Sequence, residues 1–300
     1  MKIGYPCINL SLNCKGDRTF RLKSYSEERL IQTVQNNLDC TLEMLRFNVK
    51  HHILFFRITS DLVPFASHPI CQFGWQGFFQ DKFREIGNFI KAHGIRISMH
   101  PDQFTLINSL DIGVFKRSHE ELRYHAQVLD LMGLDTSAKM QIHIGGAYGN
   151  REKSITRFIE RFGLIDEMIK RRLVVENDDR IYKIEDCLTI HVETGIPVLF
   201  DVFHHEVNNS GKTIREVLDL VSETWKESDG IPMVDYSSQR SDERKGRHAQ
   251  SIDPKAFRDF LKETKPFDFD LMLEIKNKER SALTAVEIAS DDPRLRKEAH

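Results

Sequence analysis

Eight short apolar segments recur along the chain, and this recurrence constrains the fold more than any other feature. They occupy residues 2–7, 52–58, 95–99, 140–144, 172–176, 197–201, 231–235 and 271–275. Nearly continuous apolar runs of this length are typical of strands that are buried on both faces of a parallel sheet. The sequence therefore predicts eight buried strands.

Amphipathic helical patterns separate these segments. Residues 26–47 open with a serine that can cap a helix, and apolar residues follow three and four positions apart. Similar patterns cover residues 78–94, 118–133, 154–171, 213–225 and 253–264. Alternation of strands and helices predicts parallel strands joined by crossovers. Eight such units predict a single TIM-barrel domain, a (β/α)8 fold over residues 1–300. The alternative is an open doubly wound sheet, but no G-x-G-x-x-G sequence follows the first segment.

Six consecutive predicted strands, the third to the eighth, carry an imidazole or a carboxylate at or near the carboxyl end. These residues are His100, His143, Glu176, Asp201 with His204 just beyond it, Asp235 and Glu274. In a barrel, the carboxyl ends of all strands face one mouth, where active sites lie. We therefore expect the seven side chains to converge.

Convergence of so many acids predicts a metal centre. Crowded carboxylates repel one another and retain protons unless cations neutralise them, and neutral imidazoles are good donors to divalent ions. Seven candidate ligands exceed the three that a catalytic zinc takes from a protein, so we expect more than one ion, with Glu176 able to bridge two. Clustered divalent ions suit phosphoester hydrolysis. A purely structural polar network is the alternative.

Composition excludes several other classes of protein. The chain is 40% hydrophobic and 29% charged, and none of its apolar runs approaches the roughly 18 residues of a membrane span. The first ten residues lack the pattern of a secretory signal. The cysteines are Cys7, Cys14, Cys40, Cys71 and Cys187. They are odd in number and form no C-x-x-C pair, which argues against a disulfide framework and favours a reducing cytoplasm.

The net charge of −2 does not indicate a nucleic-acid partner, so such a partner would need a local basic patch. Candidates are the stretch from Lys170 to Arg172, and Arg240, Arg244, Lys245 and Arg247. For each of them, an ordinary solvated face is the favoured interpretation.

Several motifs together resemble one known family. They are IGYPCIN (3–9), RITSDLVPFASHP (57–69), RISMHPDQF (96–104), QIHIGGAYGN (141–150), VVEND (174–178), FDVFHH (200–205), GRHAQSID (246–253) and LMLEIKNKE (271–279). In this order they resemble the UV damage endonucleases, TIM barrels akin to the endonuclease IV abasic-site enzymes. The resemblance implies nicking of DNA immediately 5′ of pyrimidine dimers and 6-4 photoproducts, and also of abasic sites. It implies two or three divalent ions that activate water, manganese first, with zinc, magnesium and cobalt as alternatives.

The resemblance also implies a role for individual residues. One ion would be held by His100, His143 and Glu176. Glu176 would bridge to a second ion, which is shared with Asp201, Asp235 and Glu274. A third ion would be held by His204 and His248, and His68 would ligate the first ion or the phosphate. Glu176, His100 and Glu274 would be catalytic. Gln103 and Phe104 would wedge into the duplex, Tyr5 and Asn9 would line the lesion pocket, and Lys153 and Lys276 would contact phosphates.

Residues 233 and 235 depart from the pattern of these endonucleases. The family pattern has a carboxylated, metal-bridging lysine and then a ligating histidine, whereas this chain has Met233 and Asp235. A thioether is a poor ligand for a hard cation, but a carboxylate can replace the imidazole. We therefore expect the third ion to bind weakly or not at all.

Other functions remain open at this point. Sugar isomerases and epimerases share the barrel and also bind divalent metals, and a plain abasic-site endonuclease would use the same chemistry. A DNA-damage binding protein without catalytic activity is a candidate from another class. For the main interpretation, the expected partner is UV-damaged double-stranded DNA, with no membrane or protein partner and a monomeric state.

Overall fold

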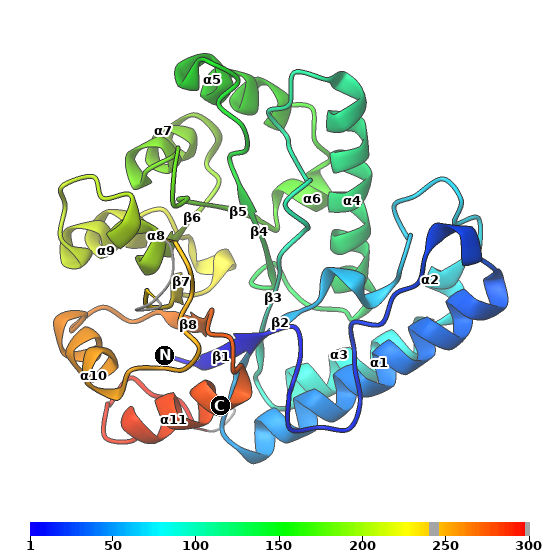
Figure 1. Cartoon of the computed structure of the whole chain (residues 1–300), viewed down its shortest axis with the longest axis horizontal. Coiled ribbons are helices and arrows are strands. Elements are labelled where there is room, and N and C mark those ends of the chain that lie inside the picture. Colours follow the sequence, from blue (N-terminus) through cyan, green and yellow to red (C-terminus); the bar gives the residue numbers. More distant parts are fainter. Residues whose placement is uncertain (240–245, 298–300) are drawn as a thin grey trace.

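The computed structural model describes residues 1–239 and 246–297 of the chain, and its centre is a closed barrel (Figure 1). Eight parallel strands follow one another around the barrel in chain order, and β8 pairs with β1. The strands are β1 (Ile3–Pro6), β2 (Phe55–Ile58), β3 (Arg96–Met99), β4 (Lys139–His143), β5 (Leu173–Glu176), β6 (Val198–Asp201), β7 (Met233–Tyr236) and β8 (Asp270–Leu273). This arrangement confirms the predicted (β/α)8 fold and excludes the open sheet.

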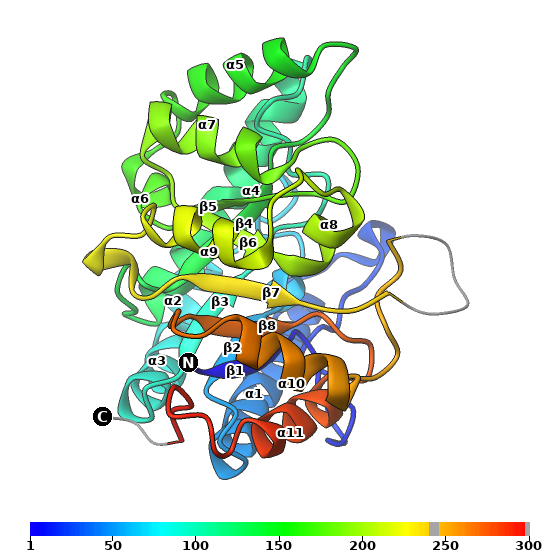
Figure 2. The ribbon, with the colours of Figure 1, turned by 90° about the vertical axis from the view of Figure 1, so that its left-hand side faces the viewer.

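Helices surround the barrel, as Figures 1 and 2 show from two sides. They are α1 (Glu27–Lys50), α2 (Trp75–Phe78), α3 (Gln80–Ala92), α4 (Ile112–Leu131), α5 (Arg151–Phe162), α6 (Glu167–Lys170), α7 (Ile184–Thr194), α8 (Val202–Val207), α9 (Ile214–Ser222), α10 (Pro254–Glu263) and α11 (Glu279–Ile288). Ser26 caps α1 as predicted, because its side chain accepts a hydrogen bond from the backbone of Arg29. Helix α4 begins before the predicted segment, since Asp111 caps it. Helices α2, α7, α8 and α11 were not predicted, and the helix predicted over residues 154–171 is divided into α5 and α6. Among the described residues, no helix has both the length and the apolar character of a membrane span.

The interior of the barrel is built in layers. One apolar cluster stands apart from the main core between barrel and helices; it consists of Phe55, Val174, Leu199, Met233 and Met272. Side chains two positions apart on a strand point to the same face. The residues two positions further on therefore also point inward, toward the carboxyl mouth. They are Arg57, Glu176, Asp201, Asp235 and Glu274.

The amino-terminal end of the barrel is closed by buried charges that pair with one another. Arg96 on β3 donates a hydrogen bond to the backbone oxygen of Asp229, and Lys139 on β4 lies 2.5 Å from Oδ1 of the same residue. Arg96 also faces Asp270 on β8 at 3.7 Å. Because these charges are paired, this end of the barrel has a structural role, and the unbalanced charge lies at the other end.

A disulfide contradicts the inference drawn from the cysteine spacing. Cys14 and Cys40 are joined, with an S–S distance of 2.08 Å, whereas Cys7, Cys71 and Cys187 are free. The loop after β1 folds back along α1, where Asn36 donates a hydrogen bond to the backbone oxygen of Lys15. This packing brings the two cysteines together, although they are 26 residues apart in the sequence.

Candidate metal centre

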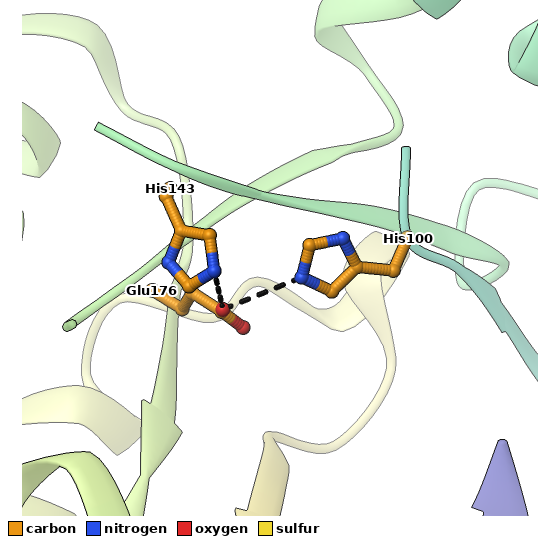
Figure 3. A group of neighbouring side chains, drawn as sticks. All are labelled: His100, His143 and Glu176. Carbon is orange, nitrogen blue, oxygen red and sulfur yellow. Dashed lines mark ion pairs between the residues drawn. The ribbon is translucent and has the colours of Figure 1, made fainter. Parts of the chain in front are cut away.

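The first cluster at the carboxyl mouth combines two imidazoles with one carboxylate (Figure 3). Both rings point at Oε1 of Glu176, with Nε2 of His143 at 2.9 Å and Nε2 of His100 at 3.5 Å. The sheet register explains this proximity, because His143 on β4 is paired directly with Glu176 on β5. Ligand atoms of the three residues all lie within 4.8 Å of one another, which is compatible with one shared ion.

A second cluster consists of carboxylates. Asp201, Asp235 and Glu274 also offer ligand atoms within 4.8 Å of one another, and the register pairs Asp201 with Asp235 across β6 and β7. Asp201 ends the strand and caps α8, since its Oδ1 accepts a hydrogen bond from the backbone of His204. His205 points elsewhere, as expected for a helix: it is buried, and its Nε2 contacts the backbone oxygen of Lys212.

Backbone carbonyls fix the orientation of three of the imidazoles. Nδ1 of His100 contacts the oxygen of Pro101 at 2.8 Å, Nδ1 of His204 that of Asn177 at 3.0 Å, and Nδ1 of His248 that of Glu274 at 2.8 Å. A carbonyl oxygen can only accept, so each Nδ1 carries the proton and each neutral ring keeps a lone pair on Nε2. Metal-binding histidines are typically held in this way.

The four imidazoles lie side by side around the mouth. Ring centroids are 5.4 Å apart for His100 and His143, 6.0 Å for His143 and His204, and 6.1 Å for His204 and His248. Nε2 of His248 lies 3.9 Å from Oε2 of Glu274. The row of rings therefore connects the first cluster to the second.

Two buried residues in this network, Arg57 and Gln141, were not predicted from the sequence. Arg57 on β2 donates hydrogen bonds to Oδ2 of Asp235 and Oε1 of Gln141, each at 2.6 Å, and also to Glu274. The amide nitrogen of Gln141 lies 2.5 Å from Oε2 of Glu176 and 2.8 Å from Oδ2 of Asp235. The alternation of inward side chains could have found Gln141, because it lies two positions before His143.

The protonation of the four acids reflects this environment. Burial disfavours ionisation of Glu176, but the imidazoles of His143 and His100 outweigh it and hold its pKa well below the usual range. Burial acts likewise on Glu274, yet Arg57 lowers its pKa to about 2. Burial raises the pKa of Asp201 to about 7 and that of Asp235 well above its usual range. The second cluster therefore lacks the positive charge that would ionise all its acids.

The donor set fits divalent cations. Oδ1 of Asp235 is buried and has no hydrogen-bond partner among the described residues, although the residue is 0% exposed. Such an atom is costly to bury unless something binds it. Carboxylate oxygens together with imidazole lone pairs are ligands for ions such as Mn²⁺ or Zn²⁺. Met233 lies in the apolar layer below and contributes no ligand at this level.

Three further residues with predicted roles belong to neither cluster. His68 is exposed, belongs to neither cluster, and accepts a hydrogen bond on Nδ1 from the backbone of Ile70. Tyr5 is fully buried, and its hydroxyl donates to Asn48 on α1 and accepts from Asn9. Asn9 is 6% exposed. The hydroxyl of Tyr5 thus connects Asn9 to α1, and the role of Tyr5 and Asn9 in a lesion pocket stays a prediction.

The residues predicted to wedge into DNA are exposed. Phe104 is 72% exposed in the loop between β3 and α4, and Gln103 beside it is also exposed. Phe104 borders a cavity of about 570 Å³ that His68 also lines. Lys153, in the first turn of α5, and Lys276, just after β8, are exposed as well.

The candidate basic patches differ in how far their side chains are exposed. Arg172 is 1% exposed and pairs with Asp130 at 2.6 Å, and Arg171 contacts the same carboxylate. The stretch from Lys170 to Arg172 thus has a structural role. Arg247 is exposed. The other candidates, Arg240, Arg244 and Lys245, lie outside the described residues.

The fold and the site together define a class, the TIM barrels with a centre of acids and imidazoles at the carboxyl ends of the strands. Comparison with known proteins narrows this class. The model of the UV-endonuclease UvdE family matches residues 1–294, and the chain belongs to that family. A UV DNA damage endonuclease of Clostridium perfringens (strain 13 / Type A) is 38% identical over 288 residues, which cover 95% of this chain and 70% of the relative.

Solved structures agree with this assignment. The crystal structure of SacUVDE superposes with a TM-score of 0.94 at 44% identity, covering 98% of this chain and all of the other. Endonuclease IV from Thermus thermophilus has a TM-score of 0.56 at 15% identity, covering 83% of this chain and 93% of the other. This second likeness shows the shared barrel alone.

Proposed function

We propose that the chain is a metal-dependent endonuclease that nicks duplex DNA immediately 5′ of UV photoproducts and leaves a 3′-hydroxyl. The observation that carries the proposal is the pair of clusters around Glu176, Asp201, Asp235 and Glu274 at one mouth of the barrel. Membership of the UV-endonuclease UvdE family supports the same function. The proposed substrates are pyrimidine dimers and 6-4 photoproducts, with abasic sites as a further substrate.

His100, His143 and Glu176 would hold one divalent ion, and Asp201, Asp235 and Glu274 a second. When bound, such ions supply Lewis-acid catalysis and a water of lowered pKa, as phosphoester hydrolysis requires. The chain itself holds the ligands in place: backbone carbonyls orient three imidazoles, and Gln141 fixes one oxygen of Glu176. Manganese is the proposed metal, with zinc, magnesium and cobalt as alternatives.

A third ion is not expected to be held tightly. His204 and His248 lie beside each other, but Met233 stands where a bridging lysine would be needed and is buried in the apolar layer. A thioether does not replace a carboxylated amine as a ligand for a hard cation.

Recognition of the lesion is assigned to Gln103 and Phe104. A pyrimidine dimer weakens stacking and pairing, so that extruding it costs less than extruding normal bases. An exposed aromatic side chain can enter the gap and hold the duplex bent. Reading deformability in this way tolerates several lesion types. The exposed lysines Lys153 and Lys276 are proposed to contact phosphates on either side.

The test is an incision assay on UV-irradiated, abasic and undamaged duplexes, each with and without Mn²⁺. We expect metal-dependent nicks next to dimers and intact undamaged DNA. Nicking restricted to the abasic duplex would replace the proposal with a plain abasic-site endonuclease. Tight binding without nicking would indicate a binding protein without catalytic activity, and inertness toward all three duplexes would redirect the search to sugar isomerisation.

A further inference from the structure

Arg57 places a buried positive charge among the acids of the candidate centre. Its side chain is 4% exposed, and its guanidinium contacts Asp235, Glu274 and Gln141. A guanidinium is permanently charged, and its planar fork can hold two carboxylates at once. Arg57 is therefore a fixed positive charge bound to one oxygen of Asp235 and one oxygen of Glu274.

In three of the carboxylates, one oxygen accepts hydrogen bonds from Arg57 or Gln141 and the other oxygen does not. Gln141 takes Oε2 of Glu176, which leaves Oε1 to face the imidazoles. Arg57 and Gln141 take Oδ2 of Asp235, which leaves the unpartnered Oδ1. Arg57 takes Oε1 of Glu274, which leaves Oε2 on the side of His248. Each of the three acids thus keeps one oxygen for an ion.

The charges of the centre agree with this division. Glu176, Asp201, Asp235 and Glu274 carry four negative charges when ionised, and the imidazoles are neutral ligands. Two divalent ions balance the four carboxylates, and Arg57 adds one further positive charge. A third divalent ion would leave a large positive excess within a few ångströms, where charge repulsion is poorly screened.

We propose that Arg57 is a positioning residue that limits this centre to two divalent ions: it withdraws one oxygen each of Asp235 and Glu274 and supplies a fixed positive charge. The inference rests on the metal centre of the proposed function and assigns the limit on metal content to a residue of β2. It does not depend on which lesion is cut.

Metal content tests the proposal without any DNA. The chelator-treated chain is dialysed against Mn²⁺, the bound metal is counted by elemental analysis, and affinities are measured by calorimetry. We expect two ions per chain for the unmodified protein and three for Arg57→Met, which frees Oε1 of Glu274, leaves Oδ2 of Asp235 with Gln141 alone, and removes the fixed charge. Arg96→Met is the matched control, because Arg96 is a buried arginine at the opposite end of the barrel; its metal content should stay at two.

The Arg57→Lys variant distinguishes the effect of the positive charge from the effect of holding two carboxylates in place. Lysine keeps the charge but cannot hold both carboxylates, so we expect two ions, with the weaker one bound roughly 10- to 100-fold less tightly. Three ions in the unmodified protein, an unchanged count in folded Arg57→Met, or unchanged affinities in Arg57→Lys would each overturn the inference. If Arg57→Met does not fold, the unmodified protein and Arg57→Lys decide the matter. A chain that binds two ions but leaves UV-irradiated DNA intact would refute the proposed function and not this inference.

Discussion

Glu176 is the residue on which the candidate centre depends most. One of its oxygens faces two imidazoles and the other accepts a hydrogen bond from Gln141, so it links the first cluster to the network of the second. Its depressed pKa keeps it ionised at neutral pH, as a metal ligand must be.

Replacement of this carboxylate should therefore abolish function without unfolding the chain. Glu176→Gln keeps the shape and removes the charge, and we expect Mn²⁺ affinity and incision of UV-irradiated DNA to fall by roughly 100-fold or more. Calorimetry and the incision assay measure the two effects. Glu193→Gln, on the exposed face of α7, is the matched control and should change neither. Normal metal binding by Glu176→Gln would remove this residue from the ligand set.

At the scale of elements, the strands could be predicted from sequence and several contacts between elements could not. All eight apolar runs are strands, because strands buried on both faces need continuous apolar sequence. Arg57 was missed because its charge stands inside such a run, and only the barrel shows that it meets Asp235. The pairing of Cys14 with Cys40 depends on how a loop packs on α1, which spacing does not encode.

The loop between β3 and α4 should be required for incision but not for metal binding. Gln103→Ala combined with Phe104→Ala removes an exposed side chain pair, so the free energy of unfolding should stay within about 0.5 kcal/mol. Loss of an aromatic stacking contact of about 1–3 kcal/mol should weaken lesion binding and incision by roughly 10- to 100-fold. Leu164→Ala, 70% exposed between α5 and α6, is the control. Incision at the normal rate would exclude the wedge.

The disulfide should stabilise the link between the β1 loop and α1. Cys14→Ser opens a covalent loop that spans 26 residues of sequence separation, and such loops contribute about 3 kcal/mol through the unfolded state. We expect a lower midpoint in urea for Cys14→Ser and for the reduced protein alike. Cys71→Ser, at a free thiol, should leave the midpoint unchanged. Equal stability of oxidised and reduced protein would contradict the prediction.

At the scale of the whole molecule, the two ends of the barrel differ in how their charges are balanced. Arg96 and Lys139 are paired with Asp229 and Asp270 at the amino-terminal end. At the carboxyl mouth, Arg57 faces several acids, and burial raises the pKa values of Asp201 and Asp235. Stability of the metal-free barrel should therefore depend on pH through its mouth.

Metal-free protein should lose stability as the pH rises from 5.5 to 8.5. Burial raises the pKa of Asp201 to about 7, so the folded state holds this proton more tightly than the unfolded state, and that stabilisation disappears between about pH 4 and 7. Burial works against protonation of His204, but Asp201 raises its pKa to about 9, so its contribution is lost between about pH 6.5 and 9. Glu176 and Glu274 have lowered pKa values and affect stability only at more acidic pH.

Thermal unfolding in chelator should show the decline, and Mn²⁺ should raise the unfolding midpoint most at pH 8.5, because cations replace the lost protons. Asp201→Asn should flatten the profile, whereas Asp219→Asn on the exposed face of α9 should not. A midpoint in chelator that rises or stays constant over this range would show that the acids at the mouth are not held together as the structure has them.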